Sequence, residues 1–150
     1  FYFTLPYFKE HSDTNHKKTI RQNSEFEPLS NKLKILIAED DKISELLISI
    51  TLKDIAHQII YAQNGEEAVQ ACLNNPDIDL VLMDMQMPIM NGNDATKEIR
   101  KINKDVLIIA QTANVLSNEN EIMLQAGCNE IITKPIEVNE LKQLIGKYFT

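Results

Sequence analysis

The sequence predicts an α/β fold in which helices cover both faces of one five-stranded parallel sheet, a doubly wound arrangement. From residue 33 onward, short apolar runs alternate five times with segments that have helical periodicity. The apolar runs are continuous rather than alternating, as is typical of parallel strands buried on both faces. Each strand is therefore followed by a helix, and the sequence shows no internal repeat that would indicate a solenoid.

The elements are short and regularly spaced along the chain. Predicted strands cover residues 34–38, 58–61, 80–83, 106–110 and 131–132. A predicted helix of about 12 residues contains Ile43, Leu46, Leu47, Ile50 and Leu52, and four others cover residues 66–73, 92–102, 117–126 and 138–148. We expect Ser117 to cap the fourth helix and Gly127 to end it.

The composition limits the class of protein. The chain has 150 residues, enough for one ordinary domain with an extension, and 43% of them are hydrophobic. A net charge of -7 argues against non-specific nucleic-acid binding. Cys72 and Cys128 are expected to be buried free thiols in a reducing compartment, so we expect a cytoplasmic segment. That location is compatible with a membrane-anchored parent protein, although no apolar run here approaches the ~20 residues of a span.

The amino-terminal part of the chain differs from the rest. Residues 1–8 are aromatic and β-prone. Residues 9–32 are polar and without hydrophobic periodicity, which predicts a linker. The folded domain is therefore expected to cover residues 33–150.

Polar residues follow four of the predicted strands at the point where each strand ends. Because the carboxyl ends of parallel strands meet at one edge of a sheet, we expect these side chains to share a cleft. They are Glu39, Asp40 and Asp41 after the first strand, Asp84 after the third, Thr112 after the fourth and Lys134 after the fifth.

Asp84 is the central residue of this group. It follows the apolar run Leu80–Met83, and Pro88 prevents the strand from continuing far beyond it. Taken alone, such an Asp is more typical of a turn cap. In the company of the other strand-end residues, we interpret it as a nucleophile that forms an aspartyl-phosphate.

Each neighbouring residue suits one task in that chemistry. Clustered carboxylates repel one another, and a bound Mg²⁺ would remove this penalty. We expect Asp40 and Asp84 to bind the ion directly, Glu39 through water, and Gln86 through its backbone carbonyl. Lys134 would supply positive charge, and Thr112 a hydroxyl donor, to the phosphoryl oxygens.

These motifs resemble the receiver domain of two-component response regulators. The resemblance covers residues 33–149 and lies in the segments around Glu39 to Asp41, Asp84 to Pro88 with Gly92, Ala110 to Ala113, and Thr133 to Pro135. It implies a flavodoxin-like (βα)5 fold and magnesium-dependent transfer of a phosphoryl group from phosphohistidine to Asp84. The segment would then be a phosphoacceptor with at most weak autophosphatase activity.

Two further features bear on the partner. Residues 1–6 resemble the last strand of a histidine-kinase ATP-binding domain, which implies a hybrid histidine kinase with its receiver at the carboxyl end. Many receivers carry an aromatic residue three positions before the lysine, where this chain has Ile131. The departure favours a receiver that hands its phosphate to a histidine phosphotransfer protein over one that drives a DNA-binding output. The partners expected are a histidine kinase domain, in the same chain or cognate, or a histidine phosphotransfer protein, with no nucleic acid and no membrane contact by this segment.

Two other functions remain open at this point. A magnesium-dependent phosphohydrolase also uses an aspartyl-phosphate, but the haloacid-dehalogenase type needs a second acid two residues after the nucleophile. Gln86 occupies that position and cannot act as an acid or base at neutral pH. A docking module with an inactive pocket is the third alternative, and binding of Mg²⁺ or uptake of phosphate from a small donor would exclude it.

Overall fold

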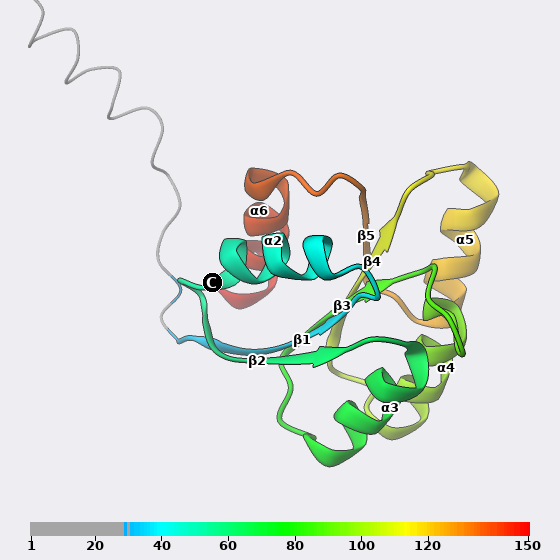
Figure 1. Ribbon diagram of the computed structural model, residues 1–150, viewed down its shortest axis with the longest axis horizontal. Helices are drawn as coiled ribbons and strands as arrows, with labels where there is room; N and C mark the ends of the chain where they lie inside the picture. The colour runs from blue at the N-terminus through cyan, green and yellow to red at the C-terminus, as the bar shows by residue number, and fades with distance from the viewer. Residues whose placement is uncertain (1–28, 30) are drawn as a thin grey trace, which may run out of the picture.

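Strands and helices alternate strictly in the computed structural model, which describes residue 29 and residues 31–150 (Figure 1). The strands are β1 (Leu33–Ala38), β2 (Ala56–Ala62), β3 (Leu80–Asp84), β4 (Leu107–Thr112) and β5 (Glu130–Thr133). The helices are α2 (Lys42–Leu52), α3 (Gly65–Asn74), α4 (Gly92–Ile102), α5 (Ser117–Ala126) and α6 (Val138–Phe149). Residues 1–8, expected to be the end of a kinase ATP-binding domain, and nearly all of the predicted linker at 9–32 lie outside the described residues.

The five strands form one parallel sheet in the order β2-β1-β3-β4-β5. The predicted fold class is therefore confirmed. The order places β3 at the centre, between β1 and β4, so that its carboxyl end is flanked by the ends of both neighbours. The chain changes direction across the sheet between β1 and β3, the kind of crossover beside which open α/β sheets bind ligands.

Two apolar layers enclose the sheet. Because successive residues of a strand point to opposite faces, Leu80 and Leu82 pack into one layer while Val81 and Met83 pack into the other. The first layer lies under α2 and α6, and the second under α3, α4 and α5 (Figure 1). All of β1, β3 and β4 is buried, which explains their continuous apolar sequences.

The helix ends follow mostly from local sequence. The Asp41 side chain caps α2 by accepting a hydrogen bond from the Ser44 backbone N–H at 2.8 Å. Gly127 ends α5 with a φ of 118°, as predicted. The predicted cap of α5 was wrong, because the chain turns helical one residue earlier than expected. Leu116 occupies the cap position and Ser117 is the first helical residue.

Helix α2 presents an unexpected face. The helix forms where its apolar spacing predicts, yet only Ile48 and Leu52 are buried against the sheet. Four large apolar side chains point to solvent instead and form what we call the exposed α2 face: Ile43 (70% exposed), Leu46 (58%), Leu47 (61%) and Ile50 (61%).

Among the described residues, every helix is too short or too polar to cross a membrane.

Candidate phosphoacceptor site

Asp84 is the last residue of the central strand β3 and is 4% exposed. The turn that follows holds its carboxylate, since the Gln86 backbone N–H donates to Asp84 Oδ1 at 3.0 Å. Gly92 lets this turn pack closely, because a Cβ there would collide with the Asp84 carbonyl oxygen and lie 2.9 Å from Met85 Cα. The backbone therefore fixes the position of one carboxylate at the sheet edge.

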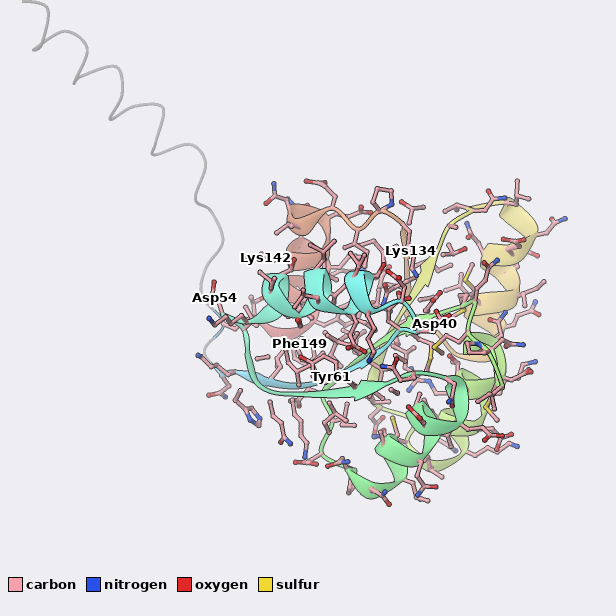
Figure 2. All side chains as sticks on the ribbon, viewed as in Figure 1. Asp40, Asp54, Tyr61, Lys134, Lys142 and Phe149 are labelled. Atoms are coloured by element: carbon pink, nitrogen blue, oxygen red, sulfur yellow. The ribbon has the colours of Figure 1, made fainter. Side chains whose placement is uncertain are left out.

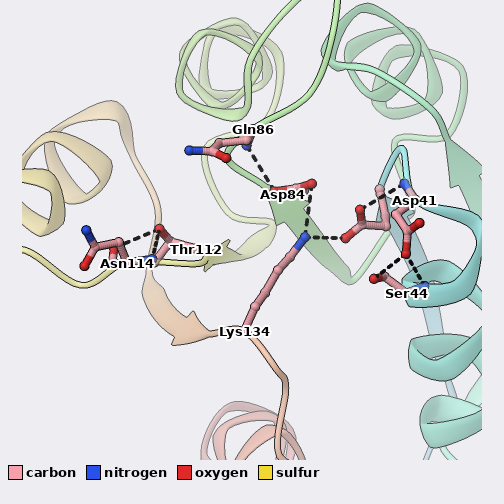
Figure 3. Close-up of polar contacts among 8 residues, drawn as sticks. Asp41, Ser44, Asp84, Gln86, Thr112, Asn114 and Lys134 are labelled. Atoms are coloured by element: carbon pink, nitrogen blue, oxygen red, sulfur yellow. Dashed lines mark hydrogen bonds and ion pairs between the residues drawn. The ribbon is translucent and has the colours of Figure 1, made fainter.

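Three acids meet at this edge. Glu39, Asp40 and Asp84 each offer a carboxylate oxygen, and these oxygens all lie within 4.8 Å of one another. Asp41, the third acid of the same run, instead bonds the Ser44 backbone and hydroxyl and lies outside the cluster (Figure 3). A divalent cation with oxygen ligands fits such a donor set. The predicted carboxylate ligands are thus brought together, while the role of the Gln86 carbonyl stays a prediction.

Lys134 joins two of these acids. Its Nζ lies 2.7 Å from Glu39 Oε2 and 3.1 Å from Asp84 Oδ2. Lys134 follows the last residue of β5, and Figure 2 shows it toward the same end of the strands as Asp40. The Lys134 backbone N–H donates to the Thr112 carbonyl at 2.8 Å, which anchors the residue to the end of β4. The predicted cleft therefore contains its positive charge.

Burial and pairing shift the pKa values of this group. Burial raises the pKa of the Glu39 carboxyl, and its hydrogen bond with Lys134 offsets only part of that shift. Burial alone would lower the pKa of the Lys134 ammonium, but the hydrogen bond with Glu39 and the charge of Asp84 outweigh it and raise the pKa. Lys134 is therefore a permanent cation at neutral pH.

Thr112 stands at the end of β4, as predicted, but its hydroxyl is engaged elsewhere. It donates a hydrogen bond to the Asn114 carbonyl oxygen at 2.9 Å and accepts one from the Asn114 backbone N–H at 3.3 Å. Figure 3 shows this pair apart from the contacts of Lys134. Thr112 and Gln86 line a common cavity of about 240 Å³ between the β3–α4 turn and α5, so the hydroxyl lies near the site without contacting Asp84.

Gln111, which the predicted site did not include, is also buried in the sheet. It precedes Thr112 in β4, pairs with Asp84 in the sheet register, and is 0% exposed. The only signal in the sequence is one amide at the end of a continuous apolar run.

Comparison with known proteins agrees with this geometry. Residues 35–146 match the model of the response regulator receiver domain. The chain belongs to the response regulator receiver domain family. It is therefore a receiver domain of two-component systems, with a role in phosphorelay. The receiver motifs between Glu39 and Pro135 all lie within the matched range.

Three relatives illustrate the match. The receiver is 35% identical to the sensor protein GacS of Pseudomonas syringae over 81% of the chain, which spans 14% of that protein. It superposes with a TM-score of 0.74 and 29% identity on the receiver domain of Saccharomyces cerevisiae Ssk1, solved with the histidine phosphotransfer protein Ypd1, covering 79% of this chain and 90% of that one. The receiver domain of a sensor histidine kinase from Pseudomonas aeruginosa was solved with magnesium in its active-site cleft. It superposes with a TM-score of 0.70 and 31% sequence identity, covering 79% of this chain and 98% of that one.

Proposed function

We propose that Asp84 of this receiver accepts a phosphoryl group from a phosphohistidine, with Mg²⁺ bound by Glu39, Asp40 and Asp84. The observation that carries the proposal is the meeting of three carboxylates and one ammonium group at the end of the central strand. A phosphorylation site needs a nucleophile, positive charge for the phosphoryl oxygens and little else. This arrangement supplies each of them.

In the transfer, an Asp84 carboxylate oxygen forms a bond to phosphorus as the bond from phosphorus to the histidine nitrogen breaks. The electron pair of the broken bond stays on the imidazole ring of the donor. The ammonium of Lys134 is already 3.1 Å from the Asp84 carboxylate and can turn to a phosphoryl oxygen. Bound Mg²⁺ would supply further neutralisation of the three acids and of the phosphoryl group.

The relatives support a particular setting for this chemistry. GacS is a sensor protein far longer than this chain, and the Ssk1 receiver was solved with a histidine phosphotransfer protein. We infer that this receiver belongs to a hybrid histidine kinase and exchanges its phosphoryl group with a histidine kinase domain or a histidine phosphotransfer protein. Helix α2 begins directly after Glu39–Asp41, and its exposed face offers such a partner an apolar surface.

Acetyl phosphate with Mg²⁺ tests the assignment of Asp84 without a protein partner. Intact-mass measurement should show the addition of one phosphoryl group, labile to hydroxylamine as expected for an acyl phosphate. Asp84→Asn should abolish this label, and addition of EDTA should do the same to the unaltered chain. Asp105→Asn, which changes an exposed acid before β4, is the matched control and should keep full labelling. Labelling that survives in Asp84→Asn would refute the assignment.

A further inference from the structure

A cavity of about 310 Å³ opens between α2 and the segment that joins β5 to α6. We call it the α2–α6 socket. Its volume is at the lower end of the range of ligand pockets, about 300–1,000 Å³, so it suits a side chain better than a nucleotide. Its walls are mostly apolar and come from α2, the end of β4, the β5–α6 segment and α6. They include Leu47, Gln111, Lys134, Ile136, Val138 and Leu141.

Gln111 is one of the residues that line this socket, and its side-chain amide has no partner among the described residues. Neither its Oε1 nor its Nε2 forms a hydrogen bond with any described residue, although the side chain is 0% exposed. A carboxamide offers one acceptor and two donors, and leaving them unmet inside a protein is unfavourable. Buried polar groups without partners are rare in folded proteins and call for an explanation.

The socket lies beside the phosphoacceptor. Gln111 pairs with Asp84 in the register of β3 and β4, so the two side chains point to the same face of the sheet. Lys134 lines the socket and also contacts Asp84 at 3.1 Å. The same lysine side chain therefore borders both the socket and the phosphoacceptor. At the rim, Leu47 (61% exposed) and Val138 (44% exposed) can change rotamer to admit it.

We propose that the α2–α6 socket receives an aliphatic side chain that ends in a carboxamide, from the protein that exchanges phosphoryl groups with Asp84, and that Gln111 recognises it. The inference rests on the proposed function, which supplies the partner. The location supports this occupant, because the protein that reaches Asp84 must cover the adjoining edge and the exposed α2 face. Gln111 is then a specificity residue of the docking surface rather than a catalytic residue.

The chemistry of the socket selects the terminal group. A cationic end would meet the ammonium of Lys134, and an anionic end would compete with Glu39 and Asp84 for that ammonium. A purely aliphatic end would leave the Gln111 amide unmet. A carboxamide can donate to Oε1 and accept from Nε2 of Gln111 at the same time, while its methylene groups pack against Leu47 and Ile136.

Butyramide, which reproduces the side chain of glutamine, is the first probe. Titrated into isotope-labelled receiver, it should shift the side-chain amide resonances of Gln111 and bind about fivefold more tightly than 2-pentanone, which has a methyl group in place of the NH2. This preference should disappear in Gln111→Leu and in Gln111→Met. Equal binding of the two compounds, or an unchanged preference in both variants, would overturn the proposal.

The free energy of unfolding provides a second readout, because it distinguishes an unmet amide from one that stabilises the fold. Because Gln111→Leu removes an unmet buried amide, the variant should resist urea at least as well as the unaltered chain. A large loss of stability in both Gln111→Leu and Gln111→Met would mean that the Gln111 amide has hydrogen-bond partners inside the fold, and the proposal would fail.

The role of the partner is tested with phosphorylated Ypd1 and with acetyl phosphate as phosphoryl donors. For Gln111→Leu and Leu47→Ala, the rate from Ypd1 divided by the rate from acetyl phosphate should fall about tenfold, as for loss of one buried contact. Leu73→Ala, an equally exposed leucine on α3, is the control and should keep the ratio. Unlabelled Asp84 with acetyl phosphate would refute the proposed function, whereas an unchanged ratio in Gln111→Leu would refute only the socket.

Discussion

Replacing Lys134 by methionine measures how strongly the charges of the site depend on one another. The substitution keeps most of the side-chain volume but leaves the Glu39 and Asp84 carboxylates, 1% and 6% exposed, without their cation. Removing one partner of a fully buried pair costs about 3–5 kcal/mol. Because the Lys134 side chain is itself 26% exposed and partly screened by water, we expect a loss of about 2–3 kcal/mol.

Urea unfolding followed by circular dichroism at pH 7 in EDTA gives this free energy. In saturating Mg²⁺ the loss should shrink to about 1 kcal/mol, because a divalent cation stabilises the folded state by mass action and neutralises the same acids. The loss of stability in Lys134→Met should therefore depend on Mg²⁺, whereas a loss caused by poorer packing alone would be the same with and without the ion.

Lys147→Met is the matched control. Its Nζ lies 2.6 Å from Glu130 Oε1, about as close as Lys134 lies to Glu39, but the lysine side chain is 63% exposed. Exposed ion pairs contribute little, so this variant should unfold close to the unaltered chain at any concentration of Mg²⁺. If Lys134→Met lost no more stability than Lys147→Met, or lost the same amount with and without Mg²⁺, the electrostatic account of the site would be wrong.

Two further predictions concern an ion pair near the amino ends of β1 and β3 and the close-packed turn after Asp84. The hydrogen bond from Lys34 lowers the pKa of the Asp77 carboxyl below 3.8, so Asp77→Asn should be less stable than the unaltered chain at neutral pH. The loss of stability should be complete above pH 3.8 and vanish as the pH falls through the lowered pKa. Urea midpoints at several pH values measure this dependence. A constant deficit down to acid pH would contradict this. Gly92→Ala should cost about 1–3 kcal/mol and slow labelling by acetyl phosphate, because its Cβ collides with the Asp84 carbonyl. Gly146→Ala in α6, by contrast, should stabilise slightly; equal effects would exclude the clash.

The sequence by itself predicted the fold and the side chains that gather at one edge of the sheet. Continuous apolar runs of four to six residues are typical of strands buried on both faces, and their alternation with helical segments predicts a parallel sheet. Once the sheet is parallel, acids and a lysine placed directly after its strands must meet at one edge. Glu39, Asp84 and Lys134 could therefore be grouped before any coordinates were known, and their distances confirm the group.

Only the tertiary structure decided which side chains contact one another. Helical spacing in α2 predicted a helix, but it could not show that Ile48 and Leu52 reach the sheet while Ile43 and Leu47 face solvent. Likewise, the hydroxyl of Thr112 bonds its own loop, and the amide of Gln111 has no partner among the described residues. The physical reason is that periodicity constrains direction along one element, whereas burial and hydrogen bonding depend on what the neighbouring elements place opposite it.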